Sequence, residues 1–185
     1  MLKPVLFALV LAALVVFRLM LLPPNATSLA TLSPAPVPAS DSIVTHVDSI
    51  LVEKSERRLT VFFEKQALKT YEVALGGNPV GHKRHQGDLR TPEGLYRIDG
   101  KNPNSAYHKN LGLSYPNDAD RAAARKLGKS PGGDIKIHGL ANGYGYIGKA
   151  HLLSDWTLGC IALTDEEIDE LYDAVPVGTP ILILP

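Results

Sequence analysis

Between residues 49 and 74 the sequence alternates short, largely apolar runs with polar turns, and this pattern limits the possible fold more than any other feature. The runs Ser49–Glu53, Leu59–Phe63 and Leu68–Ala74 predict three strands. The connections at residues 54–58 and 64–67 are short, and parallel strands would need a longer crossover. We therefore expect antiparallel strands at the start of the folded domain.

Two helices are predicted by their capping residues. Asn117 can cap a helix over residues 118–127, which has acidic residues in its first turn and Gly128 just beyond its end. Thr164 and Glu167 have the spacing of a capping box at the start of a second helix, over residues 165–175.

Further strands are predicted at Leu95–Asp99, at Asp134–Gly139 and at residues 178–185, whereas glycine and tyrosine indicate a loop over residues 143–148. Strands come first and do not alternate regularly with helices. The expected fold class is therefore mainly β with a few helices (α+β), a β-sandwich or barrel-like domain.

The N-terminal segment indicates export. Every residue from Val5 to Phe17 is apolar, Lys3 precedes the run and Arg18 follows it. This pattern predicts a signal anchor or a cleaved signal peptide over residues 1–22, and the absence of an Ala-x-Ala cleavage site favours the anchor. A buried core helix is the alternative, but the run has no polar face. Positive charge before the first apolar segment stays in the cytoplasm, so the remainder faces the exported side.

Composition divides the rest of the chain into two parts. Residues 23–46 are rich in Pro, Ala and Ser and predict an extended linker, and residues 47–185 are then the folded domain. The 185-residue chain has 19 basic and 19 acidic residues, so its net charge gives no reason to expect nucleic acid as a partner.

Cys160 is the single cysteine, so an exported chain holds it as a free thiol or in an intermolecular disulfide. Composition alone favours a buried core residue, followed by the apolar Ile161 and Leu163. A nucleophilic thiol needs a base and donors for the oxyanion. His138, at a predicted strand end, can be the base, with its second ring nitrogen bonded to a backbone carbonyl such as that of Gly139.

The segments "IHG" at 137–139 and "TLGCIA" at 157–162 together resemble the signature of the L,D-transpeptidase catalytic domain, the YkuD-like family, in its "DWTxGCIA" variant. The likeness extends to "GDLRTPEGLYRI" and to the closing helix and strand, over Val47 to Pro185. It implies an L,D-transpeptidase fold and no cofactor.

By position, the resemblance makes Cys160 the nucleophile, His138 the base and Gly139 the carbonyl that orients it. It places oxyanion donors at Gly159 and Cys160, and it places Thr157 at the family's Ser/Thr position. We expect Asp155 and Trp156 to line the site. Leu158 and Ala162 depart from the family's usual histidine and asparagine, which puts polar support of the oxyanion in doubt.

Other polar residues suggest how a substrate is held. Arg84 and Arg90, with Lys83, lie in a glycine-rich segment and suit a carboxylate, although a solvated basic loop explains them equally well. Tyr107 is a further candidate for the cleft wall. A zinc site is not expected, because the spacing of His82, His85, His108 and His151 matches no zinc motif.

The resemblance implies acyl transfer on peptidoglycan stem tetrapeptides. The Cys160 thiolate would release the terminal D-alanine, form a thioester and pass the acyl group to an amine. With water as the acceptor, the chain would be an L,D-carboxypeptidase. If the changes at Leu158 and Ala162 have removed activity, the chain would be a non-catalytic wall-binding module. A zinc hydrolase of the wall is a third class. Expected partners are peptidoglycan stem peptides and the cytoplasmic membrane, the latter through residues 5–22.

Overall fold

The structure is a computed structural model, and it describes residues 45–185. The predicted signal segment over residues 1–22, and the predicted linker up to residue 44, lie outside the described residues. Within residues 45–185, no helix combines the length and the apolar character needed to cross a bilayer.

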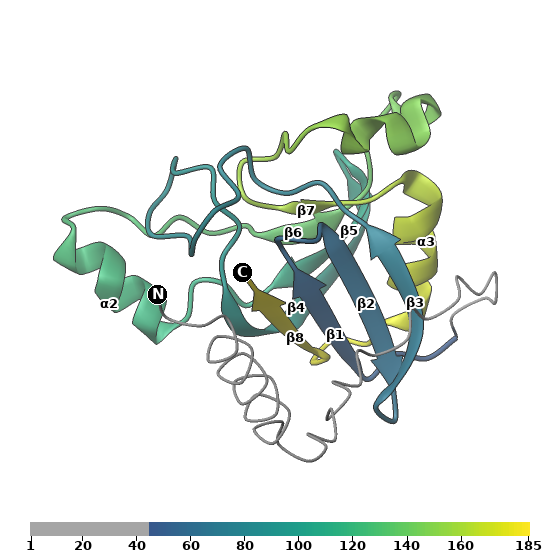
Figure 1. The fold of residues 1–185 in the computed structure, drawn as a ribbon, viewed down its shortest axis with the longest axis horizontal. Helices are drawn as coiled ribbons and strands as arrows, with labels where there is room; N and C mark the ends of the chain where they lie inside the picture. Colours follow the sequence, from purple (N-terminus) through teal and green to yellow (C-terminus); the bar gives the residue numbers. More distant parts are fainter. Residues whose placement is uncertain (1–44) are drawn as a thin grey trace, which may run out of the picture. The chain divides into compact units, whose positions relative to one another are not determined.

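The domain is built on one curled sheet of eight strands in the order β3-β2-β1-β8-β4-β5-β6-β7 (Figure 1). Neighbouring strands are antiparallel, except that β1 pairs with β8, and β6 with β7, in parallel. The strands are β1 (Ser49–Glu53), β2 (Arg58–Phe63), β3 (Gln66–Glu72), β4 (Gly94–Ser105), β5 (His108–Leu113), β6 (Lys136–His138), β7 (Ile161–Ala162) and β8 (Pro180–Leu184).

The two edges of this sheet meet, which makes the fold barrel-like. Just after β3, Ala74 exchanges backbone hydrogen bonds with Ala162 of β7, and Gly76 forms a bridge with Thr157. The long strand β4 pairs with both β8 and β5, and its register with β5 shifts twice, after Ile98 and after Asn102. Such bulges bend a strand and increase its twist. The segment before Cys160 is therefore fixed to the far edge of the sheet.

The hydrophobic core fills the inside of the curled sheet. Alternate residues of the strands are fully buried there, for example Val52, Leu59 and Ile181 on one half and Leu111, Ile137 and Ile161 on the other. Helix α3 (Asp165–Ala174) adds Ile168 and Leu171 to this core and contacts β5 and β6. Burial of each such side chain contributes about 1.5–3 kcal/mol. The core thus holds β6 and β7 rigidly from one side.

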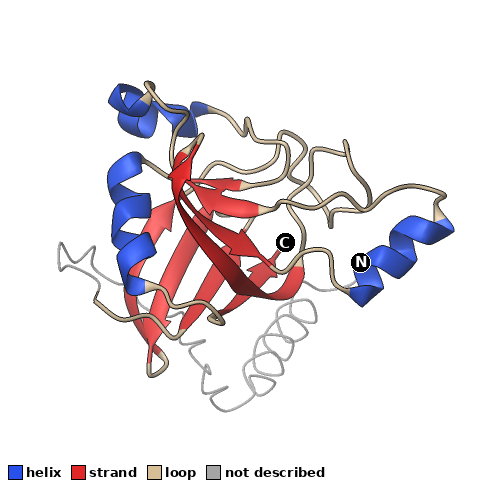
Figure 2. Cartoon of the chain, turned by 180° about the vertical axis from the view of Figure 1, so that it is seen from behind, coloured by secondary structure: helices blue, strands red, loops and turns tan. Residues whose placement is uncertain are grey.

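Both predicted helices are present with their predicted caps. Helix α2 (Asp118–Lys126) has Asn117 as its N-cap, and α3 has Thr164, each in a complete capping box. Helix α2 lies at one end of the domain, and α3 lies beside the sheet at the other (Figures 1 and 2). A third helical segment, the 3-10 helix η1 (Gly145–Leu153), lies where a loop was expected.

The prediction of a mainly β fold with a few helices is confirmed, but its details needed correction. There is one mixed curled sheet, not a sandwich of two sheets. Residues 108–113, expected to be irregular, form β5. This strand has one face on the core and the other on a cavity lined partly by Asn110, so its sequence lacks the clear alternation of a strand with one solvated face.

Candidate active site

Cys160 and His138 are brought together by the parallel pairing of β6 and β7. Ile137 pairs with Ile161 and His138 pairs with Ala162, so Cys160, directly before β7, lies beside Lys136. Successive side chains of a strand point to opposite faces. Because Ile137 and Ile161 face the core, Lys136, His138 and Cys160 share the opposite face of the sheet.

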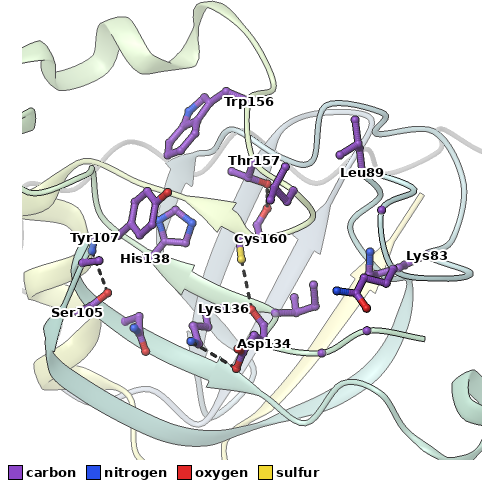
Figure 3. A pocket seen from close by; sticks show the side chains of 18 of the residues that line it. Lys83, Leu89, Ser105, Tyr107, Asp134, Lys136, His138, Trp156, Thr157 and Cys160 are labelled. Atoms are coloured by element: carbon purple, nitrogen blue, oxygen red, sulfur yellow. Dashed lines mark hydrogen bonds and ion pairs between the residues drawn. The ribbon is translucent and has the colours of Figure 1, made fainter. Parts of the chain in front are cut away.

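That face forms the floor of a cavity of about 820 Å³, within the usual size range of ligand pockets (Figure 3). Residues that the sequence analysis named as catalytic or substrate-binding candidates line it, among them Tyr107, His138, Trp156, Thr157 and Cys160. The exposed Leu158, at the position where the family usually has histidine, lies on the same wall. The structure therefore gathers the proposed nucleophile, the proposed base and an apolar rim around one cavity.

Two threonine hydroxyls fix the backbone at Cys160. The Thr157 hydroxyl donates to the Cys160 carbonyl oxygen over 2.9 Å, and the Thr91 hydroxyl donates to the same oxygen over 3.4 Å. Thr157 Oγ1 also accepts the Gly159 N–H, and Thr91 Oγ1 accepts the Gly76 N–H. The Gly159 N–H, expected to be an oxyanion donor, is therefore engaged inside the loop, which leaves the Cys160 N–H as the candidate donor.

The packing of the loop requires glycine at position 159. Its φ is +134°, and a Cβ atom there would lie 2.6 Å from the Arg90 carbonyl oxygen. The glycine lets the Cys160 loop approach the backbone of residue 90, so its role is in the packing of the loop.

The imidazole of His138 is held in a defined tautomer. Its Nδ1 lies 2.7 Å from the carbonyl oxygen of Gly139, as expected, and a carbonyl oxygen can only accept. Nδ1 therefore carries the proton, and Nε2 is left as the acceptor. The Cys160 thiol donates to the Asp134 carbonyl oxygen over 3.6 Å, and the backbone N–H of Lys136 also interacts with its sulfur. Rotation about its side chain would be needed to direct the sulfur to His138.

Burial keeps both reacting groups neutral at rest. It raises the pKa of the Cys160 thiol above its ordinary value, even though the backbone N–H and the ammonium of Lys136 oppose this shift. It also lowers the pKa of His138, against the effect of the hydrogen bond to Gly139. The resting pair is a thiol and a neutral imidazole, which suits general-base activation of the thiol.

Aromatic rings enclose the His138 imidazole. Its ring centroid lies 4.7 Å from that of Tyr107 and 5.8 Å from that of Trp156, and the Tyr107 and Trp156 rings are stacked 6.2 Å apart (Figure 3). These contacts restrict the ring's rotation and exclude water from it. Tyr107 and Trp156 therefore lie on the wall of the cavity that also holds His138 and Cys160.

Three of the predicted substrate-binding residues do not line the cavity. Asp155 faces away from it, accepting the Leu75 N–H and pairing with Arg57 at 2.9 Å. Arg84 is exposed outside the cavity, and Arg90 packs against Gly81 and donates to the His82 carbonyl. Sequence position could not reveal this, because the folding of residues 77–93 decides which way each side chain points.

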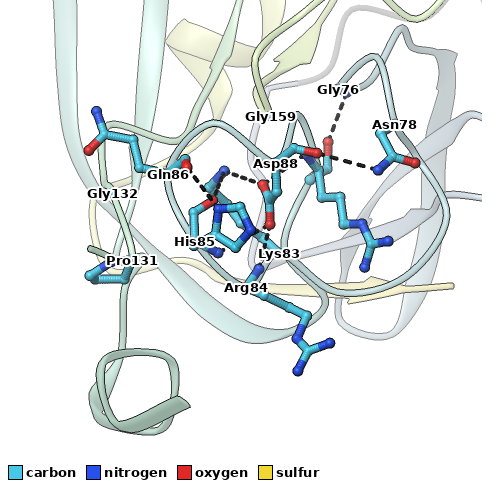
Figure 4. A network of polar contacts seen from close by, with 12 residues as sticks. Gly76, Asn78, Lys83, Arg84, His85, Gln86, Asp88, Pro131, Gly132 and Gly159 are labelled. Carbon is cyan, nitrogen blue, oxygen red and sulfur yellow. Dashed lines mark hydrogen bonds and ion pairs between the residues drawn. The ribbon is translucent and has the colours of Figure 1, made fainter. Parts of the chain in front are cut away.

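The glycine-rich segment of residues 81–90 is organised by a buried ion pair (Figure 4). Lys83 Nζ lies 2.8 Å from Asp88 Oδ1, and both side chains are almost fully buried. Although burial acts against it, the Lys83 ammonium and the backbone N–H groups of Arg84, Arg90 and His85 lower the pKa of Asp88 to about 2. The charge of Lys83 is therefore neutralised internally.

The four histidines considered as zinc ligands in the sequence serve other contacts. His82 bonds Asp120 at 3.0 Å, His108 bonds Asp169 at 2.8 Å, and His85 binds the Gln86 carbonyl. His151 is buried against Trp156. Within residues 45–185 no three His, Cys, Asp or Glu side chains are grouped so that they could hold a metal ion.

Thr91, Asn110 and Lys136 are among the residues near the site that were not identified from the sequence. Thr91 lies in the quoted segment "TPEG" and could have been noticed there, because it bonds the Cys160 carbonyl. Asn110 and Lys136 line the floor of the cavity through strand register, a long-range property that no local pattern shows.

The structure thus combines a curled β-sheet with a free cysteine and a tautomer-fixed histidine on one of its faces. The model of the L,D-transpeptidase catalytic domain (YkuD) matches residues 48–183. The chain therefore belongs to this family of cysteine L,D-transpeptidases, which act on peptidoglycan stem peptides.

Curated relatives carry the same family name. The chain is 28 % identical over 134 residues to "Putative L,D-transpeptidase YafK" of Escherichia coli K12, covering 68 % of this chain and 46 % of that one. It is 30 % identical over 138 residues to "Putative L,D-transpeptidase YqjB" of Bacillus subtilis 168, covering 72 % and 69 %. The chain thus matches less than half the length of the first of these relatives.

Solved structures share the fold. Bd1075 of Bdellovibrio bacteriovorus is similar with a TM-score of 0.53 and 26 % identity, over 79 % of this chain and 50 % of that one. The helical cell shape determining protein Pgp2 of Campylobacter jejuni has a TM-score of 0.56 at 24 % identity, over 78 % and 51 %. The second similarity bears on the fold alone.

Proposed function

We propose that the chain is an L,D-transpeptidase that transfers acyl groups between peptidoglycan stem peptides through a thioester on Cys160. The observation that carries the proposal is the pairing of β6 and β7, which sets Cys160 and the tautomer-fixed His138 on one cavity floor. Membership of the family supplies the substrate class.

The first half-reaction forms the thioester. His138 Nε2 takes the thiol proton while Sγ attacks the carbonyl before the terminal D-alanine of a tetrapeptide. Negative charge on the carbonyl oxygen is stabilised by the backbone N–H of Cys160. The C–N bond then breaks, and His138 returns the proton to the amine of the departing D-alanine.

The second half-reaction resolves the thioester. An acceptor amine attacks the acyl carbon, its proton passes to Nε2, and the thiolate leaves and recovers that proton from His138. Atoms and charge balance without a cofactor. Water as the acceptor would give the free tripeptide and make the chain an L,D-carboxypeptidase. The reaction products distinguish the two acceptors.

The same proposal includes the site of action. The apolar segment over residues 5–22 would anchor the chain in the cytoplasmic membrane, and the Pro- and Ala-rich residues 23–46 would tether the catalytic domain on the exported side, near the wall. This orientation is tested by fusing a reporter to the chain after residue 185. The reporter is one that is active only outside the cytoplasm, so we expect it to be active. An inactive reporter would refute it.

Product analysis tests the reaction. The full chain is incubated with muropeptides that carry defined tetrapeptide stems, and the products are identified by mass spectrometry. We expect crosslinked dimers and free D-alanine with the wild type, and neither with Cys160→Ala. Tripeptide without dimers would indicate the carboxypeptidase. No product from a correctly folded wild type would favour the wall-binding module, and products made by Cys160→Ala but abolished by a chelator would favour a zinc hydrolase.

A further inference from the structure

The floor of the cavity carries two polar side chains that the proposed reaction does not use, Lys136 and Asn110. Both project from the face that bears His138 and Cys160, because Asn110 pairs with His138 and Lys136 pairs with Gly112 across β5 and β6. Lys136 is also the neighbour of Cys160 on the adjoining strand, about 4.8 Å away between backbones. These two residues therefore border the reacting groups directly.

Lys136 is a cation that is available to a ligand. Its nearest carboxylate, Asp134 Oδ1, lies 3.5 Å away on a side chain that is 92 % exposed (Figure 3). An exposed pair of this kind contributes little to stability and is easily exchanged. Lys83, which also lines the cavity, is buried and held at 2.8 Å by Asp88. A negatively charged ligand in this cavity would therefore find its counter-ion in Lys136.

Asn110 supplies a neutral hydrogen-bonding group beside this cation. The residue is only 5 % exposed, and its side-chain amide has no hydrogen-bond partner among the described residues. Its amide atoms are not among the fully buried polar atoms that lack a partner, so they reach the cavity. An amide that faces the cavity without a protein partner is free to exchange water for a polar ligand.

We propose that Lys136 and Asn110 form a carboxylate-binding subsite that holds the terminal carboxylate of the donor peptide. The inference rests on the proposed function for the identity of the peptide. The subsite takes over the role that the sequence suggested for Arg84 and Arg90, neither of which lines the cavity.

Covalent geometry favours the terminal carboxylate over a more distant one. In a peptide attacked at the carbonyl before its last residue, only the amide nitrogen and one α-carbon separate that carbonyl from the terminal carboxylate. The carboxylate must then lie next to the sulfur, as Lys136 does. An ammonium and an amide N–H together satisfy a carboxylate by charge and by hydrogen bonding. The subsite would thus select stems that end directly after the scissile bond.

A test that needs no enzymatic turnover compares two alkylating reagents of similar shape. Iodoacetate carries a carboxylate and iodoacetamide does not, so the ratio of their rates at Cys160 reports the local positive charge independently of the thiol pKa. We expect Lys136→Met to lower this ratio on the order of fivefold at low salt. Lys136→Arg should keep it, and added salt should lower it in the wild type.

Lys126→Met, at an exposed lysine of α2 that does not line the cavity, is the matched control and should leave the ratio unchanged. Circular dichroism confirms that each variant is folded. An unchanged ratio in folded Lys136→Met would overturn the assignment of Lys136.

A binding measurement then tests the peptide itself. Titration of Cys160→Ala with a stem tetrapeptide ending in D-alanine, and with its C-terminal amide, should show about tenfold tighter binding of the acid. Lys136→Met and Asn110→Ala, each in this background, should reduce that preference. Equal binding of acid and amide would refute the subsite. A clear preference without any thioester in the wild type would instead refute the proposed function and leave the subsite standing.

Discussion

A methyl group on Gly159 would lie 2.6 Å from the Arg90 carbonyl oxygen, at a φ of +134° that side chains of L-residues rarely adopt. Gly159→Ala should therefore shift the Cys160 loop and destabilise the fold by about 2–4 kcal/mol. Chemical denaturation measures the loss. Gly100→Ala, with no atom near the added Cβ and no positive φ, is the control and should cost much less. A stable Gly159→Ala variant would contradict the close approach of the two loops.

A second single residue, His138, determines how the rate of the proposed reaction depends on pH. The base must be neutral to accept the thiol proton, and burial lowers its pKa below the ordinary 6.5. Protonation should therefore abolish activity only when the pH falls below that value. The pH profile of kcat/KM measures this acid limb. Activity lost already above pH 7 on acidification would show that His138 is not the neutral base described above.

At the scale of elements, the segment of residues 81–90 depends on Asp88, which binds Lys83 and three backbone N–H groups. The folded-state pKa of about 2 lies below the ordinary 3.8, so this stabilisation is present above pH 3.8 and is lost as the pH falls toward 2. Asp88→Asn should cost on the order of 2 kcal/mol near neutral pH. Denaturant titrations of both proteins at pH 7 measure it, and equal stabilities would show the pair to be unimportant.

The elements also show what sequence reasoning can reach. The helices starting after Asn117 and Thr164 were predicted correctly, because a capping box is a local signal. The strand at 108–113 was missed, because its hydrophobic pattern reflects a core on one side and a cavity on the other.

Some residues of the site can be predicted from local sequence motifs, whereas the positions of others depend on long-range contacts. His138 and Cys160 were recognisable from short motifs in the sequence. The placement of Asn110 and Lys136 on the cavity floor follows from the register of β5, β6 and β7, and the outward position of Arg84 follows from a loop fold. Neither can be read from residue spacing.

For the whole molecule, two buried histidines link folding to pH. Burial lowers the pKa of both His138 and His151, so below about pH 6.5 the unfolded chain binds protons that the folded chain does not. Stability should therefore fall as the pH drops through this region, which thermal unfolding from pH 8 to pH 5 measures.

His151→Phe separates the two contributions. Neither ring nitrogen of His151 has a partner among the described residues, and its ring packs against Trp156. Phenylalanine keeps the ring contact and removes the unpaired polar atoms, so stability at pH 7 should be unchanged or about 1 kcal/mol higher. The dependence on pH should also be shallower. A variant with the same pH dependence as the wild type would mean that His151 does not titrate on unfolding.

We propose that Cys160 carries the acyl group of a stem peptide, and intact-protein mass spectrometry detects such an adduct. The full chain is mixed with a tetrapeptide that offers no amine acceptor. We expect a mass gain on Cys160 equal to the tetrapeptide less its terminal D-alanine. This gain should be lost when an acceptor amine is added, and it should be absent in Cys160→Ala. Release of D-alanine by a Cys160→Ala protein, or turnover by the wild type without any adduct on Cys160, would contradict it.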